Sequence, residues 1–206
     1  MKRVLFQGDS ITDASRSREN DVNKGIGYAT LVSAELGLDY PGEYEFINRG
    51  VGGDRIVEVY GRIKRDILNL KPDIISILIG VNDVWHEINW QNGVPVKKFE
   101  KIYNMLIEEI IEELPNTKII ILEPFALKGI GTEGKWDEFR MDLEAHAKVA
   151  EKIADRFNLK FVPLMEKFDQ ATKLAPPEYW LYDGVHPTSV GHEIIKREYL
   201  KAFKEL

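Results

Sequence analysis

The chain has 206 residues with 28 basic and 34 acidic side chains, so its formal net charge at pH 7 is −6. It contains no cysteine, which excludes disulfide bonds, a thiol nucleophile and thiolate-bound zinc. Acids and bases are interspersed, whereas a nucleic-acid binder commonly shows a basic face, so no nucleic-acid partner is expected. A chain of this length is most simply one α/β domain over residues 1–206.

The apolar segments are too short for a secretory leader or a membrane span. Near the N-terminus, Val4-Leu5-Phe6 is followed by polar Gln7, whereas a leader needs about 7–15 apolar residues. The longest apolar stretch runs from Ile74 to Val81, which is less than half of the roughly 20 residues that cross a bilayer. We therefore expect a cytoplasmic protein with no membrane partner.

Short apolar runs bounded by Gly, Pro, Asn or Asp predict buried strands, and apolar residues at helical spacing predict helices between them. In chain order, the predicted elements are strand 4–6, strand 44–47, helix 56–70, strand 74–79, helix 99–114, strand 119–122, helix 143–157, strand 161–162 and helix 195–206. Strands that are apolar on both faces and alternate with helices indicate a parallel sheet covered by helices on both sides. The Gly-rich segment from Glu123 to Trp136 predicts a long, mobile loop at the rim.

Ligands of open parallel sheets bind beyond the carboxyl ends of the strands, so the residues that follow each strand are candidates for a site. These segments are Gly8 to Ile11, Asn48 to Asp54, Gly80 to Asp83 and, before the last helix, Asp183 to Pro187. Each also has an ordinary structural interpretation. Ser10 and Asp13 have the spacing of a helix capping box, and Asn82-Asp83 and Asp183-Gly184 are common cap or turn signals.

The chain has four histidines, and only His186 lies in one of these segments. Asp183, three residues before it, can accept a hydrogen bond from Nδ1 and leave Nε2 to act as a base. His146 is expected to be solvated, His86 to lie in a loop where it could line a pocket, and His192 to make a structural hydrogen bond. A metal site built from Asp183, His186 and His192 is disfavoured because it lacks a third strong ligand at matching spacing.

Taken together, these segments resemble the SGNH hydrolase family, also called GDSL-type esterases and lipases. Gly8-Asp9-Ser10-Ile11 matches the first sequence block of the family, with Ile where the family name has Leu. Gly53 matches the second block, Gly80-x-Asn82-Asp83 the third, and Asp183-x-x-His186-Pro187 the fifth. The resemblance extends from about Val4 to the final helix.

This resemblance implies a three-layer, flavodoxin-like sandwich with a central parallel five-stranded sheet. It also implies that Ser10 is a nucleophile, His186 its general base, and Asp183 the group that orients the imidazole. The backbone N–H groups of Ser10 and Gly53 and the side-chain amide of Asn82 would form an oxyanion hole, with no cofactor or metal. Ser10 does not lie in a G-x-S-x-G elbow, which argues against the α/β-hydrolase fold.

Within the family, the segments from Gly80 to Trp85 and Pro124-Phe125 look most like acetylxylan-esterase-like members. The likeness implies removal of short acyl groups, acetyl above all, from a carbohydrate such as a xylo-oligosaccharide through an acyl-enzyme on Ser10. Trp85, Phe125 and Trp180 are candidates to contact the substrate, although plain core packing explains each of them equally well. The partners implied are a small-molecule ester or an acetylated oligosaccharide, and relatives of this subgroup form homo-oligomers.

Two other functions stay open at this point. A lysophospholipase or thioesterase of the same family would need an apolar groove for a long chain, and the helix stripes already account for the apolar segments of this sequence. A non-catalytic carbohydrate-binding protein on a hydrolase scaffold would have no need for Ser10, Asp183 and His186 together. An ester-hydrolysis assay distinguishes this binding protein from an enzyme.

Overall fold

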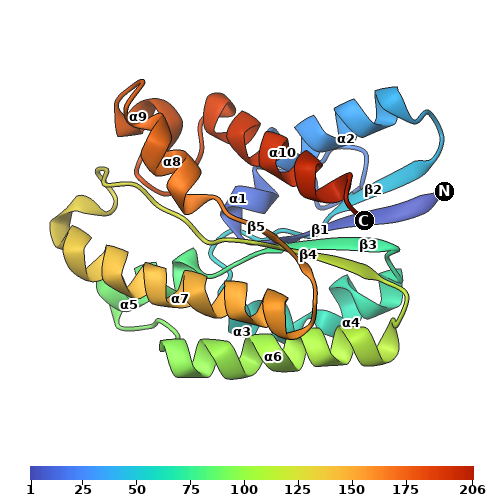
Figure 1. Ribbon diagram of the computed structural model, residues 1–206, viewed down its shortest axis with the longest axis horizontal. Coiled ribbons are helices and arrows are strands. Elements are labelled where there is room, and N and C mark those ends of the chain that lie inside the picture. The colour runs from blue at the N-terminus through green and yellow to red at the C-terminus, as the bar shows by residue number, and fades with distance from the viewer.

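The predicted parallel sheet is confirmed in the computed structural model, which describes residues 1–206. All five strands run parallel in the order β2-β1-β3-β4-β5, and helices cover both faces of the sheet (Figure 1). The strands are β1 (Lys2–Gly8), β2 (Tyr44–Asn48), β3 (Ile74–Leu78), β4 (Lys118–Leu122) and β5 (Lys160–Val162). The helices are α1 (Ser10–Asp13), α2 (Tyr28–Asp39), α3 (Ile56–Gly61), α4 (Ile63–Asp66), α5 (Val81–Trp90), α6 (Val96–Glu113), α7 (Trp136–Arg156), α8 (Met165–Ala171), α9 (Pro177–Trp180) and α10 (Ser189–Phe203), with 3-10 turns η1 (Leu68–Leu70) and η2 (Glu133–Lys135).

The strand order places a topological switch point between β1 and β3. The chain leaves β1 toward β2 on one side and later returns to β3 on the other side, where Gly8 pairs with Leu78. Crossover connections that depart in opposite directions from adjacent strands leave a crevice beyond the carboxyl ends of those strands. Ser10 and Asn82 follow these two strand ends, so the fold brings both segments to the crevice.

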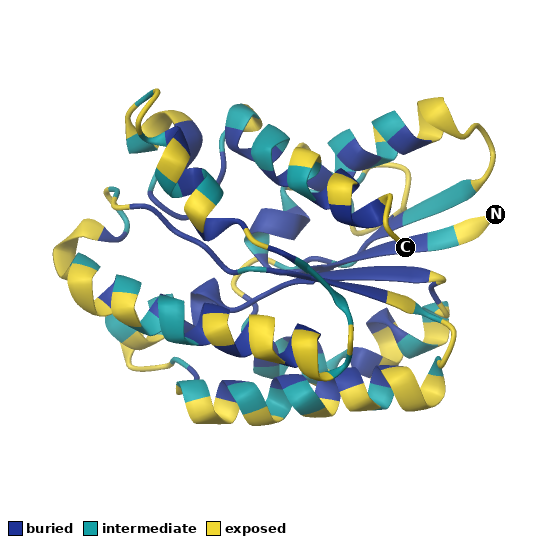
Figure 2. Ribbon diagram, viewed as in Figure 1, coloured by how far each residue is buried: buried dark blue, intermediate teal, exposed yellow.

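Two buried apolar clusters lie on opposite faces of the sheet. Along β1, Val4 and Phe6 belong to one cluster and Leu5 belongs to the other, because successive side chains of a strand point to opposite faces. Helices α2 and α10 cover the first face, and α3 and α6 cover the second (Figure 1). The strands β1, β3 and β4 are accordingly buried along most of their length, whereas the edge strands β2 and β5 are mostly half-buried (Figure 2). Burial on both faces explains the apolar sequences of the inner strands.

The prediction of a single helix over 56–70 is wrong. That segment forms α3, α4 and the turn η1. The break falls at Gly61, a poor helix former, and at Arg62, whose backbone leaves the helical region at φ −109° and ψ 7°. The Arg62 side chain at this break binds the carboxylates of Asp54, which precedes α3, and of Asp66 in α4.

The other differences concern helix boundaries and helices that the apolar stripes did not reveal. Helix α7 starts at Trp136, well before the predicted start at residue 143, and α5 occupies the segment after β3 that was expected to be a loop. Helix α2 was missed because apolar residues occur all around it, as exposed Leu38 and buried Leu36 illustrate. No helix is both long enough and apolar enough to cross a membrane.

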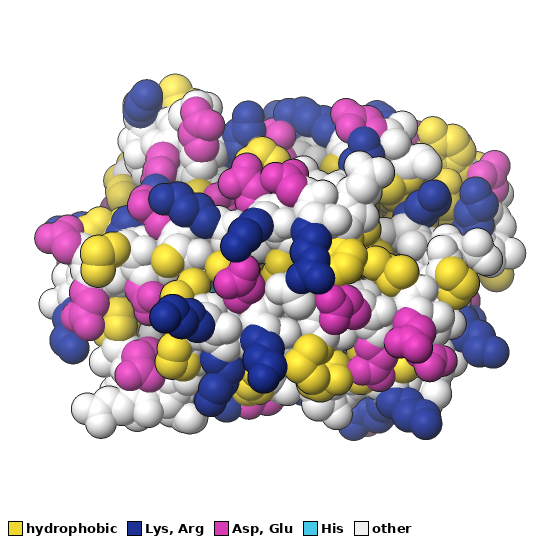
Figure 3. All heavy atoms as spheres, turned by 60° about the horizontal axis from the view of Figure 1, so that its bottom comes forward, with side chains coloured by type: hydrophobic (Ala, Val, Ile, Leu, Met, Phe, Trp, Pro, Cys, Tyr) yellow, Lys and Arg dark blue, Asp and Glu magenta, His cyan; other side chains and the backbone are white.

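Basic and acidic side chains alternate on the face seen in Figure 3 rather than gathering into one patch of either sign. Two ion pairs join α7 to α6, Lys152 with Glu100 and Arg156 with Glu108. Pairs this exposed contribute about 0–1 kcal/mol each, so the packing of apolar side chains between the helices and the sheet dominates stability.

Candidate active site

Ser10, His186 and Asp183 form a hydrogen-bonded row at the carboxyl end of β1. Ser10 Oγ lies 2.9 Å from His186 Nε2, and His186 Nδ1 lies 2.7 Å from Asp183 Oδ2. Since a carboxylate only accepts hydrogen bonds, Nδ1 carries the proton in neutral imidazole and Nε2 is free to accept the Ser10 proton. The structure therefore brings together three residues that lie up to 176 positions apart in the sequence.

A sharp turn between β1 and α1 presents Ser10 to solvent. Gly8 allows this turn because a Cβ there would lie 2.3 Å from the carbonyl oxygen of Leu78 and 2.4 Å from Thr12 Oγ1. The next residue, Asp9, caps α1 by accepting a hydrogen bond from the Ile11 N–H at 2.9 Å. Asp9, rather than Ser10, is thus the cap of this helix, and the Ser10 side chain remains available to His186.

The Asp183 carboxylate is held by its own loop. Its Oδ1 accepts hydrogen bonds from the backbone N–H groups of Val185 at 2.9 Å and His186 at 2.8 Å. Burial alone would raise the pKa of Asp183, but these bonds and the bond from the His186 ring hold it below its usual value. In turn, the Asp183 hydrogen bond raises the pKa of His186, and partial burial of the ring opposes that rise.

The Glu123–Trp136 loop contacts the segment that carries Asp183. The Gly131 N–H donates to the Asp183 carbonyl oxygen at 2.8 Å, and the Leu127 N–H donates to that of Gly184 at 2.8 Å. Thr132 Oγ1 adds a bond to the Leu127 carbonyl oxygen at 2.8 Å. This loop supports the position of Asp183 in addition to forming part of the rim.

Gly53 and Asn82, the predicted oxyanion donors, lie on two loops that meet beside Ser10. A Cβ added to Gly52 would lie 3.8 Å from Ser10 Cβ, so the neighbouring Gly53 belongs to a loop that reaches Ser10. Gly53 has φ +83°, a left-handed conformation that favours glycine. Asn82 is buried, and its Nδ2 donates to the Asp54 carbonyl oxygen at 3.0 Å, which fixes the amide and leaves its second N–H available.

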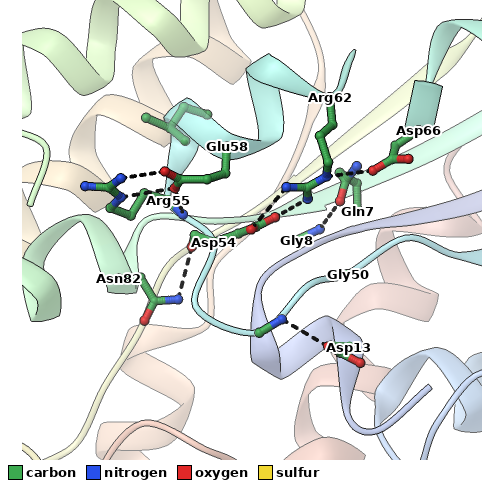
Figure 4. Close-up of polar contacts among 12 residues, drawn as sticks. Gln7, Gly8, Asp13, Gly50, Asp54, Arg55, Glu58, Arg62, Asp66 and Asn82 are labelled. Carbon is green, nitrogen blue, oxygen red and sulfur yellow. Dashed lines mark hydrogen bonds and ion pairs between the residues drawn. The ribbon is translucent and has the colours of Figure 1, made fainter. Parts of the chain in front are cut away.

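A network of polar contacts supports the loop that carries Gly53 (Figure 4). The Arg62 guanidinium bridges the carboxylates of Asp54 and Asp66, and Asp83 accepts a hydrogen bond from the Ile56 N–H at 3.1 Å. On the other side of Ser10, the Gly52 N–H donates to Asp13 Oδ2 at 3.0 Å. These contacts fix the backbone that carries the Gly53 N–H, as preorganised catalytic donors require.

Two buried carboxylates beneath Ser10 and Asn82 were not recognised in the sequence as part of the site. Burial raises the pKa of Asp9 to about 7, although the hydrogen bond from Ile11 and the nearby His186 oppose the rise. Burial also raises the pKa of Asp83 well above its usual value. The one feature of the sequence that could have identified them is their position shortly after the strand ends, where Asp9 adjoins Ser10 and Asp83 adjoins Asn82.

The three candidate aromatic residues have different positions. The Trp85 ring centroid lies 5.7 Å from that of His186, and Trp85 Nε1 donates to the Gly131 carbonyl oxygen at 3.0 Å. Phe125 is 0% exposed and stacks on Phe168 with the ring centroids 4.3 Å apart, so it belongs to the core. Trp180 is also buried, with Nε1 bonded to the Ala175 carbonyl oxygen. The prediction that Phe125 and Trp180 contact substrate is therefore wrong, because the helices at that end of the sheet cover both rings.

A cavity of about 450 Å³ opens beside Ser10 and His186, and only three of its eleven lining residues are hydrophobic. The lining residues are Ser10, Asp13, Ala14, Ser15, Arg16, Arg18, Ile26, Tyr182, His186, Pro187 and His192. Tyr182 is 59% exposed and lies parallel to the His186 ring at 5.6 Å between the ring centroids. Tyr182 and the two arginines were not recognised in the sequence as part of the site, although Tyr182 directly precedes Asp183.

The remaining histidines have structural positions. His192 Nδ1 accepts a hydrogen bond from the Tyr28 N–H at 3.1 Å as predicted, and burial lowers its pKa to about 4. His86 lies on α5 against Trp90. His146 is 0% exposed, and its ring nitrogens lie 2.8 and 2.9 Å from the carbonyl oxygens of Asp142 and Val94, so the expectation that it is solvated is wrong. No group of three or more His, Asp or Glu side chains is arranged to hold a metal ion.

Comparisons with known proteins agree with this architecture. A model of the GDSL-like lipase/acylhydrolase family matches residues 6–194. An acetylxylan esterase from Geobacillus stearothermophilus is 31% identical over 97% of this chain and 93% of its own length. The crystal structure of Axe2, an acetylxylan esterase of the same organism, superposes with a TM-score of 0.88 at 30% identity, covering 98% of this chain and 93% of that one. A candidate GDSL-like lipase from Parabacteroides merdae has a TM-score of 0.89 at 34% identity, covering 98% of this chain and 94% of that one.

Proposed function

Because this chain belongs to the GDSL-like lipase/acylhydrolase family, we propose that it is a serine esterase that removes short acyl groups, acetyl above all, from a carbohydrate such as a xylo-oligosaccharide. The observation that carries the proposal is the hydrogen-bonded row of Ser10, His186 and Asp183 at the edge of an open, mostly polar cavity. The similarity to an acetylxylan esterase over nearly the full length supports the choice of acyl group and sugar.

The geometry suits acyl transfer in two steps. His186 Nε2 takes the Ser10 proton as Oγ bonds to the ester carbonyl carbon, and the carbonyl oxygen becomes an oxyanion. When this intermediate collapses, the C–O bond to the sugar breaks and the sugar oxygen takes the proton from His186. A water molecule, deprotonated by His186, then attacks the acyl-enzyme, and the acid leaves as Ser10 regains its proton.

The proposed oxyanion hole stabilises the negative charge that develops in both steps. The Arg62 and Asp83 contacts fix the loop that carries the Gly53 N–H, and the Asp54 carbonyl oxygen fixes the Asn82 amide. The Ser10 N–H lies at the start of α1, which Asp9 caps. Because these donors need no reorganisation during the reaction, they stabilise the transition state more than the ground state.

Replacement of Asn82 by Ala tests this arrangement. We expect kcat to fall by about 10²–10³-fold with little change in KM, because the lost donor acts on charge that exists only in the transition state. Asn82→Asp should be at least as damaging, because it places a negative charge against the oxyanion. If Asn82→Ala lowers the melting temperature while kcat stays near the wild-type value, Asn82 is a structural residue and only backbone donors remain.

The pH dependence of kcat/KM should show one ionisation of His186. The imidazole must be neutral to accept the Ser10 proton, so activity is lost as the pH falls through the pKa of His186 and is complete above it. The hydrogen bond to Asp183 raises that pKa from its ordinary 6.5, so the midpoint should lie on the alkaline side of 6.5. Initial rates on a non-ionising acetyl ester from about pH 5 to about pH 9 measure it, and a flat profile would contradict a base role for His186.

A series of 4-nitrophenyl esters of increasing chain length tests the acyl preference. The cavity beside Ser10 has few hydrophobic lining residues, so it offers little surface to bind a long acyl chain. The acetyl ester should therefore have a higher kcat/KM than the octanoyl ester. The opposite order would favour the lysophospholipase or thioesterase alternative, and the absence of turnover on every ester would favour a binding protein.

A further inference from the structure

Arg16 differs from the other arginines of the chain in its electrostatic surroundings. The chain has ten arginines, and nine of them lie within 4.0 Å of a carboxylate oxygen. Arg16 is the exception, and it lines the cavity that opens beside Ser10 and His186. A half-buried guanidinium without a counter-ion is costly unless it interacts with an anion that the protein itself does not supply.

The hydrogen bonds of Arg16 fix its orientation and leave one edge of the guanidinium free. Nε donates to the Gly50 carbonyl oxygen at 2.8 Å, and Nη1 donates to the Ser17 carbonyl oxygen at 3.2 Å. A guanidinium has five N–H groups, so the second N–H of Nη1 and both N–H groups of Nη2 remain without partners. This edge has the geometry that binds a carboxylate through two parallel hydrogen bonds.

No carboxylate forms an ion pair with Arg16, and Asp13 and Asp66 interact with it only at longer range. The closest carboxylate in the cavity lining, that of Asp13, is already paired with Arg18 and accepts the Gly52 N–H. A second hollow of about 430 Å³ shares Arg16 and Arg18 with the cavity and has no hydrophobic lining residue. Of its three acids, Asp21 and Asp66 are paired with Arg49 and Arg65, and Glu19 forms no ion pair. Arg16 is thus the one arginine lining these two hollows that forms no ion pair.

We propose that Arg16 binds a carboxylate on the alcohol portion of the substrate, so that the enzyme prefers esters of acidic sugars, such as glycans with a uronosyl group, over esters of neutral ones. This inference rests on the proposed esterase function and adds a specificity residue to it. Arg16 takes no part in bond breaking. It positions the leaving sugar while Ser10, held on the adjoining turn, attacks the acyl group.

A pair of acetyl esters that differ only in charge tests the proposal: 4-acetoxybenzoate and its neutral methyl ester. The ratio of their kcat/KM values is divided by the ratio of their rates of hydrolysis by hydroxide, which removes the difference in leaving-group reactivity. For the wild-type protein we expect a normalised preference for the anionic ester of about 10- to 100-fold, the range of a hydrogen-bonded charge pair. Rising salt concentration should reduce this preference and leave the rate on the methyl ester unchanged.

Arg16→Gln should lower kcat/KM for the anionic ester by about 10- to 100-fold more than for the methyl ester, which brings the normalised ratio near one, and Arg16→Lys should retain part of the preference. Arg156→Gln on α7, an exposed arginine paired with Glu108, is the control and should change neither rate.

A normalised ratio near one in the wild-type protein overturns the proposal, and this result does not depend on any variant folding. Equal losses of kcat/KM on both esters in Arg16→Gln also overturn the proposal, since they show that Arg16 only holds the loop that contains Gly50. If the wild-type protein hydrolyses the methyl ester without any preference, the esterase function stands and only the role of Arg16 fails. If it hydrolyses no acetyl ester, both fail.

Discussion

Ser10→Ala should lower kcat for ester hydrolysis by about 10⁶-fold and leave the protein folded. The side chain of Ser10 makes one hydrogen bond within the protein, to His186, and Asp9 rather than Ser10 caps α1. Removing Oγ therefore eliminates the nucleophile with little effect on packing. Initial rates on 4-nitrophenyl acetate and a thermal unfolding curve on the same preparation give both quantities.

Ser33→Ala is the matched control. Its hydroxyl donates to the Ala29 carbonyl oxygen within α2, so the substitution removes a serine hydroxyl without touching the site. Its rate should equal that of the wild-type protein. Wild-type activity in folded Ser10→Ala would refute the acyl-enzyme mechanism and the assignment of the site with it.

Asp183→Asn should lower kcat/KM by about 10⁴-fold while the loop keeps its conformation. The remaining side-chain oxygen can still accept the N–H groups of Val185 and His186. The new amide N–H, however, faces His186 Nδ1, so Nδ1 becomes an acceptor and the ring proton moves to Nε2. In that tautomer the imidazole cannot accept the Ser10 proton.

Asp155→Asn, on the exposed side of α7, controls for the loss of one negative charge and should retain full activity. Melting temperatures of the two variants separate a folding defect from a catalytic one. Near-normal kcat/KM in folded Asp183→Asn would show that the carboxylate serves only to hold its loop, and another group would have to orient His186.

The sequence was sufficient to predict the sheet because each strand is apolar on both faces, a pattern that does not depend on distant residues. It was also sufficient to predict that the segments of Ser10, Asn82 and His186 lie at one edge of the sheet. Ser10, Asn82 and His186 lie directly beyond strand ends or before the last helix, and parallel strands bring such positions to one edge.

Features that depend on contacts between distant segments could not be predicted. The Arg62 side chain at the helix break pairs with Asp54, which precedes the helix, and the Phe125 ring stacks on Phe168 of α8. His146 looked solvated because its sequence neighbours are charged, whereas its ring actually contacts Phe99 of α6 and the Val94 carbonyl oxygen. Local patterns give the periodicity of a helix but not the identity of the residues that face it.

The burial of Asp9 means that this carboxyl group takes up a proton when the chain folds between mildly acidic and neutral pH. In the unfolded chain the carboxyl group loses its proton near its ordinary pKa of 3.8, whereas in the folded protein the pKa is about 7. Between these values the folded state binds the proton and the unfolded state does not, so this group makes the protein less stable as the pH rises from one to the other. Above both pKa values a charged carboxylate remains buried directly beneath Ser10. The pH range in which His186 is neutral is therefore also the range in which Asp9, on the turn that carries Ser10, destabilises the fold most.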